Sequence, residues 1–253
     1  MVKLSVVIIT FNEEKNIGRC LDSVKDIADD IVIIDSFSTD KTEEICKKYS
    51  ENFIQRKWEG YSATKNFANE QAKFDWILSL DADEALSEKL KKSIVEWKKL
   101  SEAVPAKFSR LSNYCGQWIH HCGWYPDIKV RIFNRRNAKW SGKIHEKLII
   151  DNPEKVFHLL GDCLHYTYYT IDEHRKQVDG FTDLMANDLM TNGSKPNLII
   201  IYLSPIAKFF NSYFLKLGFL DGYYGFIICK ISAKATFLKY WKLKKLYESQ
   251  ENK

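Results

Sequence analysis

The first third of the chain alternates short β-branched runs with longer segments whose apolar residues recur at helical spacing. Residues 4–9 form a near-continuous apolar run, as expected of a strand buried on both faces of a parallel sheet. In 16–27, which follows, Ile17, Leu21 and Val24 share one helical face. The alternation continues with strands at 31–34, 52–55 and 76–80, and with helices at about 39–49, 62–72 and 86–97. This pattern predicts βαβ units in a Rossmann-like α/β sheet flanked by helices.

From Lys107 onward the chain is richer in aromatic and polar residues, and this composition favours strands of a mixed sheet. We expect strands at 108–111, 130–133 and 148–150, and a loop at 115–125. The turn-like residues 192–196 mark a further change of composition. The sequence therefore predicts one domain at 1–194, with halves 1–106 and 107–194, followed by a helical extension at 195–253.

Composition describes an ordinary globular protein. The 253 residues are 45% hydrophobic and 28% charged, with a net charge of +5, which excludes collagen-like and disordered classes. Six widely scattered cysteines favour a reducing compartment, and the N-terminus reads directly into a strand without a signal peptide, so we expect a cytoplasmic location. The most apolar stretch, 196–207, is 12 residues long. A spanning helix needs roughly 20, so we expect no segment that crosses a membrane on its own.

Acids and amides follow the predicted strands at 10–14, 35–40 and 81–84. In open parallel sheets, ligands bind beyond the carboxyl ends of the strands, so these residues are candidate site residues. Neither GxGxxG nor GxxxxGK[ST] occurs there. Dinucleotide-dependent hydride transfer and P-loop ATP hydrolysis are therefore disfavoured.

Asp81 and Asp83 are alternate residues at a strand end. Carboxylate oxygens there suit Mg²⁺ or Mn²⁺, which leave coordination positions open for substrate phosphates, and a diphosphate leaving group needs such a positive charge. The alternative is that they only end a strand and cap a helix. The acidic ends of the first two strands favour the metal site.

These segments resemble a known family. The runs SVVIITFNEE, IIDSFSTD and WILSLDADE resemble the three N-terminal motifs of family 2 glycosyltransferases, which have the GT-A fold. Further motifs resemble the subgroup that contains lipopolysaccharide core beta-glucosyltransferases, at 123–127, 130–133, 140–146 and 164–166. Residues 216–225 resemble the C-terminal tail of that subgroup.

The resemblance implies roles for individual residues. It assigns the turn containing Thr10, Asn12 and Glu13, together with Asp35 and Asp40, to the nucleoside. Lys65 and Asn66 would lie near the donor sugar or diphosphate. Asp81 would contact the ribose or the metal, and Asp83 would be the main metal ligand. Two further residues have structural alternatives: Arg131 would help to neutralise the diphosphate or form an ion pair, and His165 would complete the metal shell or be an ordinary strand histidine.

Inverting transfer by single displacement needs a carboxylate that takes the proton of the attacking hydroxyl. The Glu-Asp pair that many relatives use as the base is missing here. Two candidates remain, Glu146 and Asp127. We favour Glu146 because the neighbouring His145 can help to orient it.

The segment 195–253 holds ten lysines, three acids and 13 of the 35 aromatic residues, for a net charge of +7. A helix there would have an apolar face made of Phe209, Phe210, Tyr213, Phe214 and Leu217. Its other side would be polar and would carry Lys208, Asn211, Ser212 and Lys216. This pattern is typical of helices that lie in a membrane interface. Packing on the catalytic domain and a dimer contact are the alternatives, and no nucleic-acid motif accompanies the lysines.

Together these features predict a metal-dependent inverting glycosyltransferase. It would move a sugar from a nucleotide-diphospho-sugar, UDP-linked by first expectation, to a lipid-linked saccharide such as lipopolysaccharide core. The enzyme would sit peripherally on the inner face of the cytoplasmic membrane through 195–253. Alternatives are a glycosyltransferase of capsule, polyprenyl-linked glycan or protein, and a non-catalytic module that binds sugar nucleotide or membrane. The donor sugar, the acceptor hydroxyl and the oligomeric state stay open.

Overall fold

The computed structural model describes residues 1–142, 146–151 and 155–251. The chain forms two compact units, Met1–Leu111 with Asp127–Tyr166, and Ser112–Pro126 with Thr167–Lys253. The predicted boundary at 194 falls inside the second of these units, between two of its helices. His145, expected to orient Glu146, lies outside the described residues.

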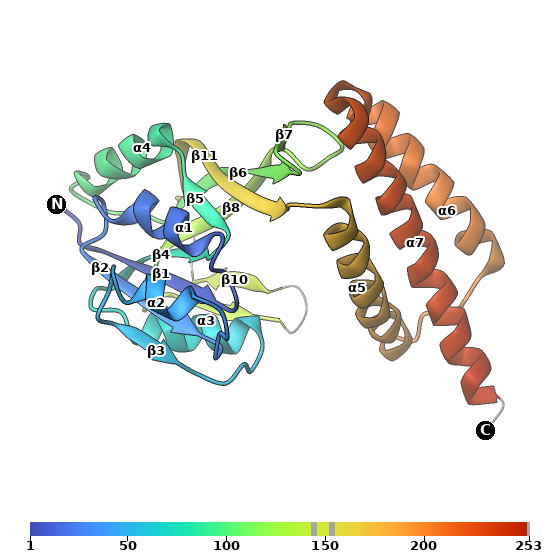
Figure 1. Cartoon of the computed structure of the whole chain (residues 1–253), viewed down its shortest axis with the longest axis horizontal. Coiled ribbons are helices and arrows are strands. Elements are labelled where there is room, and N and C mark those ends of the chain that lie inside the picture. The colour runs from blue at the N-terminus through green and yellow to red at the C-terminus, as the bar shows by residue number, and fades with distance from the viewer. Residues whose placement is uncertain (143–145, 152–154, 252–253) are drawn as a thin grey trace. The chain divides into compact units, whose positions relative to one another are not determined.

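The first unit is built on a mixed sheet. Its parallel part has the order β3-β2-β1-β4, formed by β1 (Leu4–Thr10), β2 (Asp30–Asp35), β3 (Phe53–Gln55) and β4 (Trp76–Asp81). The sheet continues beyond β4 with β8 (Asp127–Asn134), β6 (Ala106–Tyr114), β11 (Phe157–Tyr168) and β5 (Glu84–Leu86). A separate antiparallel pair comprises β9 (Ala138–Ser141) and β10 (Lys147–Ile150). The predicted strands are confirmed, with different ends (Figure 1).

Four helices accompany this sheet: α1 (Ile17–Val24), α2 (Thr42–Cys46), α3 (Tyr61–Glu70) and α4 (Glu88–Lys98). Successive residues of β1 enter two different cores, because side chains alternate across a strand. Val6 and Ile8 pack with α1 and α4, whereas Val7 and Ile9 pack with α3 and the β9–β10 pair. Both faces of the parallel sheet are therefore covered, as its continuous apolar strands predict. Leu86, predicted on the α4 face, belongs to β5 instead.

The second unit is mainly helical. Its elements are β7 (Gln117–Ile119), α5 (Ile171–Thr191), α6 (Leu198–Phe210), the π-helical turn η1 (Asn211–Leu215), the 3₁₀ turn η2 (Gly218–Asp221) and α7 (Gly222–Glu251). Helix α7 packs along both α5 and α6 (Figure 1). A core of its own includes Tyr114, Ile119 and Ile228. Thr170 and Glu173 form a capping box that begins α5.

Residues 216–225 turn the chain from α6 into α7. The buried carboxylate of Asp221 accepts hydrogen bonds from the backbone nitrogens of His120 and His121 at 3.2 and 2.8 Å, and it lies 3.0 Å from Nδ1 of His121. A Cβ on Gly225 would stand 1.9 Å from the carbonyl oxygen of Gly218, so only glycine allows this approach. This recognisable stretch of sequence thus ties the 115–125 loop to the helices.

Two details of the C-terminal segment differ from the sequence analysis, while the expectation that no segment crosses a membrane on its own stays a prediction. Residues Leu198–Leu215 form an 18-residue helical run of mean hydropathy 1.5, long and apolar enough by composition to cross a membrane. The sequence estimate of 12 residues stopped at Lys208, although one lysine does not end a helix. The predicted apolar face also differs, because Phe209 and Tyr213 pack against the core of the second unit and Ser212 is buried.

Candidate active site

The loops that follow β1 and β2 are joined by reciprocal hydrogen bonds. The side-chain oxygen of Asn12 accepts from the backbone nitrogen of Thr39 at 2.8 Å, and the backbone nitrogen of Asn12 donates to the Ser38 hydroxyl at 2.8 Å. Asp40 accepts from the backbone nitrogen of Glu14 at 3.1 Å. Asn12 has a φ of 54°, a left-handed conformation that asparagine tolerates. Asn12 and Asp40 therefore shape one preformed edge of the site.

Asp35 and Thr10 lie opposite each other in the register of β2 and β1. The carboxylate of Asp35 is fully buried and accepts hydrogen bonds from the Ser38 backbone at 2.9 Å, the Ser38 hydroxyl and the Gln55 amide at 3.3 Å. The Thr10 hydroxyl is buried without a hydrogen-bond partner in the described part of the chain. In the described part of the chain, the Thr10 hydroxyl thus has no hydrogen-bond partner, whereas the neighbouring Asp35 carboxylate already accepts hydrogen bonds from Ser38 and Gln55.

Glu13 connects this edge to the acidic motif after β4. Burial raises its pKa to about 7, and the charges of Asp83 and Asp40 act in the same direction. The Asn16 amide opposes the rise by donating to Glu13 Oε2 at 2.7 Å, and His165 also opposes it. These influences place Glu13 in the same electrostatic neighbourhood as Asp83 and His165.

Asp83 and His165 come together across a strand pair. In the antiparallel register of β11 and β5, His165 lies opposite Glu84. Its Nε2 is 3.1 Å from Oδ2 of Asp83, and the backbone nitrogen of Tyr166 donates to the Asp83 carbonyl at 2.9 Å. The two residues predicted as metal ligands from sequence positions 82 apart are therefore in contact.

Lys65 is the central cation of the site. Its side chain is 1% exposed, and Nζ lies 2.9 Å from Oδ1 of Asp81 and 3.2 Å from Oε1 of Glu146. Arg131 approaches the other Asp81 oxygen at 3.1 Å. Burial opposes ionisation of Asp81, but Lys65 and Arg131 hold the pKa of its carboxyl well below the usual range. Asp81 is therefore a charged residue with a cation at each oxygen.

The ion pairs continue beyond Arg131. Glu84, which is buried, lies 3.1 Å from Arg131 and 3.3 Å from Arg110. Arg110 then contacts Asp127 at 2.7 Å, and Lys129 contacts the other Asp127 oxygen at 3.0 Å. Burial works against ionisation of Asp127, but these two cations lower its pKa. The resulting charge row alternates in sign: Glu146, Lys65, Asp81, Arg131, Glu84, Arg110, Asp127, Lys129.

The sequence reasoning missed two residues of this neighbourhood, Arg110 and Tyr61, and it gave Glu84 no specific role. Glu84 and Arg110 join the two candidate bases into one row. Tyr61 begins α3 and is 42% exposed; burial raises the pKa of its hydroxyl, and the charges of Asp81 and Glu146 add to the rise. Glu84 ends the WILSLDADE run and is among the candidate residues at 81–84, whereas Arg110 and Tyr61 belong to no quoted motif.

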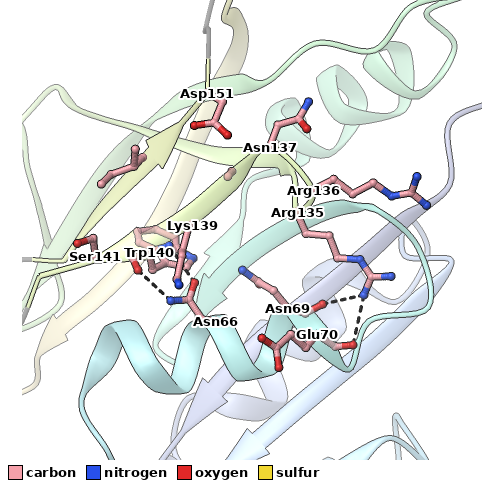
Figure 2. Close-up of a pocket in the computed structure, with 12 residues that line it drawn as sticks. Asn66, Asn69, Glu70, Arg135, Arg136, Asn137, Lys139, Trp140, Ser141 and Asp151 are labelled. Carbon is pink, nitrogen blue, oxygen red and sulfur yellow. Dashed lines mark hydrogen bonds between the residues drawn. The ribbon is translucent and has the colours of Figure 1, made fainter.

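A pocket of about 650 Å³ lies between α3 and the β9–β10 pair. Figure 2 shows the Asn66 side chain bonded twice to the backbone of Trp140, donating to the carbonyl at 2.8 Å and accepting from the nitrogen at 2.9 Å. Arg135 donates to the carbonyls of Asn69 and Glu70 near the end of α3. Asn66, expected near the donor, therefore holds β9 in place, and the lining includes none of the charge-row carboxylates.

The side chains around Asp83 provide two of the ligands that a divalent ion needs. Within residues 1–142, 146–151 and 155–251, no group of three or more His, Cys, Asp or Glu side chains could hold an ion. Asp83 and His165 do present a carboxylate and an imidazole side by side. Mg²⁺ is commonly held by one or two carboxylates together with substrate phosphates and water. The pair therefore suits an ion that is completed by the substrate, while both oxygens of Asp81 face cations.

A parallel sheet with acid-tipped strands, an Asp-x-Asp end on β4 and a contacting histidine defines the class of GT-A glycosyltransferases. Residues 5–149 match the family model described as glycosyl transferase family 2. The chain belongs to this family and is a transferase enzyme. The predicted GT-A fold with a helical C-terminal extension is confirmed.

Relatives extend over almost the whole chain. An "Uncharacterized glycosyltransferase" of Rickettsia bellii is 32% identical, covering 96% of this chain and 87% of its own. The "Lipopolysaccharide core biosynthesis glycosyltransferase LpsC" of Rhizobium meliloti is 29% identical over 93% of this chain and 89% of its own. Among solved structures, S. aureus TarS 1–349 in complex with UDP aligns with 98% of this chain and 92% of its own, at 16% identity and a TM-score of 0.45.

Proposed function

We propose that this glycosyltransferase moves a sugar from a nucleotide-diphospho-sugar, UDP-linked by preference, to a lipid-linked saccharide such as lipopolysaccharide core. The reaction is a single displacement with inversion at the anomeric carbon. The similarity to LpsC supports the core acceptor, because it covers nearly all of both chains. The segments at 123–127, 140–146 and 164–166, which resemble motifs of the lipopolysaccharide core beta-glucosyltransferase subgroup, support the same acceptor class, and the donor sugar stays open.

One observation carries the assignment of chemistry to this site, namely the Lys65 bridge between Asp81 and Glu146. It brings a carboxylate from the 140–146 motif beside the acidic end of β4, although the two are 65 positions apart in the chain. In the proposal Glu146 takes the proton of the acceptor hydroxyl as the new glycosidic bond forms. Lys65 holds the Glu146 carboxylate in position for that transfer.

Asp127 is the weaker candidate for the base. Its carboxylate contacts two cations, Arg110 at 2.7 Å and Lys129 at 3.0 Å, and its pKa is lowered. A base must accept a proton during the reaction, and a carboxylate with a depressed pKa is a poorer acceptor. Asp127 is also separated from Asp81 by three charged side chains of the row. We therefore assign it to holding Arg110.

The donor would lie along the preformed loop edge. Thr10, Asn12 and Asp35 line the nucleoside side, with Asp40 bracing the loops and Glu13 facing the diphosphate side. Asp83 and His165 would hold a divalent Mg²⁺ or Mn²⁺ ion, which when bound supplies positive charge to the leaving diphosphate. Asp81 fixes Lys65 and Arg131, and Arg131 in turn orients Glu84.

The acceptor chemistry suggests where the protein works. All six cysteines are free thiols, which suits a reducing compartment. A nucleotide-sugar donor is made inside the cell, whereas a lipid-linked saccharide presents its sugar at a membrane surface. We therefore propose action at the cytoplasmic face of the membrane.

The first test is hydrolysis and transfer with a panel of UDP-, GDP- and ADP-sugars in the presence of Mn²⁺. We expect turnover with a UDP-sugar and its loss in Asp83→Ala. A matched control is Asp75→Ala, which removes a carboxylate that pairs only with Arg135 and Arg136 among the described ion pairs. The melting temperature should also be measured with UDP, GDP and ADP in the presence of Mn²⁺. The proposal fails if none of these nucleoside diphosphates raises it.

The second test compares the two candidate bases with truncated lipopolysaccharide acceptor. Glu146→Gln should lower the transfer rate by roughly 10²–10⁴-fold, the range of general base catalysis, while donor binding is kept. Asp127→Asn should lower it much less. If Glu146→Gln kept near-normal turnover with folding intact, the base would be reassigned to Asp127.

A further inference from the structure

The second unit exposes an unusually apolar helical surface. Along α6, Ile199, Leu203, Ile206 and Phe210 recur at spacings of four, three and four residues, and they are 67%, 59%, 57% and 59% exposed. This spacing places them on one helical face. Ile201, on another face, is fully buried, and α6 packs along α7. The helix thus has a partner on one side and an apolar stripe open to solvent on the other.

The apolar character continues past α6. Leu215 at the end of η1 is 77% exposed, and Leu220 in η2 is 57% exposed. Only 11% of the run Leu198–Leu215 is buried. Soluble monomers rarely expose continuous apolar patches beyond a few hundred Å², and larger patches mark interaction sites. We refer to the α6 stripe together with η1 and η2 as the α6 surface.

Charge distinguishes between the possible occupants of this surface. Between Asp188 and Glu248 the chain has nine lysines and one acid, Asp221. Asp221 is 4% exposed and already accepts two backbone hydrogen bonds and contacts His121. Lys242 pairs with Asp183 of α5, and Lys244 and Lys245 pair with Glu248, so the excess of cations in this segment comes from the other six lysines. A second copy would bring lysines toward lysines, whereas an anionic lipid layer offers both hydrocarbon and negative charge.

The arrangement of α6 and α7 indicates how deeply the α6 surface would enter a lipid bilayer. Helix α7 runs beside α6 and carries six lysines, at 230, 234, 239, 242, 244 and 245. Each lysine at the centre of a bilayer disfavours insertion by about a hundredfold. Leu217 has a left-handed φ of 54°, so the chain turns there and does not continue as one straight helix. The pair α6–α7 therefore suits a position in one leaflet and does not suit a crossing.

We propose that the α6 surface lies in the interface of an anionic lipid bilayer, with α6 parallel to the membrane plane and Ile199, Leu203, Ile206 and Phe210 directed into the lipid. Lysines of the same unit contact the headgroups. The inference goes beyond the transfer reaction, since it rests on the second unit alone and holds for any sugar donor. It replaces the predicted face through Phe209 and Tyr213, which pack inside the unit.

Vesicle flotation of the full-length chain tests the proposal without any donor. We expect binding to phosphatidylglycerol-containing vesicles, weaker binding to pure phosphatidylcholine, and loss of the difference at about 0.5 M salt, because the charges are then screened. Leu203→Glu combined with Phe210→Glu should weaken binding by at least about tenfold. The matched control is Leu184→Glu combined with Phe181→Glu on α5, which places the same charges at other exposed apolar positions and should leave binding unchanged.

Several results would overturn the inference. Equal loss in the α5 control would show that the α6 surface is not the contact. Membrane-bound protein that resists alkaline carbonate extraction would indicate a spanning segment. The protein could also form a dimer in the absence of lipid. If the double variant Leu203→Glu, Phe210→Glu were then a monomer, the α6 surface would be a self-association site. Far-UV circular dichroism and nucleotide-sugar hydrolysis confirm that each variant is folded, and since hydrolysis needs no membrane, failure of membrane binding is separable from failure of the proposed reaction.

Discussion

Replacing Lys65 with methionine removes one charge from the centre of the site and keeps most of its volume. In the native chain Nζ of Lys65 is 2.9 Å from Asp81 and 3.2 Å from Glu146, and the lysine side chain is 1% exposed. The substitution leaves Asp81 with Arg131 alone and leaves Glu146 without this cation. Removing one partner of a buried ion pair costs about 3–5 kcal/mol, because the remaining charge stays desolvated.

The carboxylates in this case are partly hydrated, which reduces that cost. Asp81 and Glu146 side chains are 27% and 24% exposed. We therefore expect Lys65→Met to lower the free energy of unfolding by about 2–3 kcal/mol at pH 7. At 2–4 °C per kcal/mol for a chain of this size, the melting temperature should fall by about 4–12 °C. Lys3→Met is the matched control: Lys3 also lies 2.9 Å from a carboxylate, that of Asp29, but it is 62% exposed, so its loss should cost less than about 1 kcal/mol.

Lowering the pH should reduce the difference in the free energy of unfolding between the native chain and Lys65→Met. Lys65 and Arg131 depress the folded-state pKa of Asp81 against the opposing effect of burial. The ionised Asp81 therefore stabilises the fold above its unfolded pKa of roughly 4, and this contribution disappears as the pH falls toward the lower folded pKa. Without Lys65 the depression is smaller, so less stability is available to lose. The gap between the two proteins should be largest above about pH 5 and smaller near pH 3.

Urea unfolding at several pH values measures these quantities. Fluorescence and circular dichroism should be followed together, because the chain has two compact units and their transitions can separate. A change below about 0.5 kcal/mol at pH 7 for Lys65→Met, or a change equal to that of Lys3→Met, would refute the argument that this bridge is a strong buried interaction.

Three further predictions concern other parts of the chain. His165→Ala should weaken Mn²⁺-dependent binding of UDP by about tenfold or more, as measured by calorimetry, while binding of Mn²⁺-free UDP changes little. Burial lowers the pKa of His174 to about 4, below its unfolded value near 6.5, so stability that is full above pH 6.5 should decline by up to about 3 kcal/mol as the pH falls to 4, and His174→Gln should flatten that slope in urea titrations. Asp221→Asn should destabilise the second unit by about 1–3 kcal/mol, since it leaves a weaker acceptor for two backbone donors, whereas Glu248→Gln at an exposed position should change stability much less in the same assay.

The sequence predicted those features that are set by local pattern. Apolar runs of β-branched residues identify β1, β2 and β4, and the change to acids marks where each strand ends, so Asp35 and Asp81 were found as strand-end residues. Helix α5 was not predicted, because its polar positions surround the helix and only the capping box of Thr170 and Glu173 marks its start.

Long-range pairing was beyond the reach of the sequence. Nothing in the spacing of Lys65, Asp81 and Glu146 indicates that one lysine contacts both carboxylates. That contact depends on how the fold places α3, the end of β4 and the start of β10, which Glu146 precedes. Arg110 likewise reads as an ordinary strand residue until β6 and β8 pair and set it beside Asp127. Partner choice among charged residues is a property of the tertiary fold.

The alternating charge row gives a physical reason for the proposed metal ion. Its four carboxylates are matched by four cations, each within 3.3 Å of a carboxylate oxygen. A nucleotide diphosphate adds negative charge to a row that is already neutral, and drawing Lys65 or Arg131 toward it would leave Asp81 or Glu84 less well paired in a buried position. A divalent ion held by Asp83 and His165 would offset the diphosphate charge without breaking the row. We therefore expect the metal requirement of donor binding to follow from the completeness of the ion pairs around it.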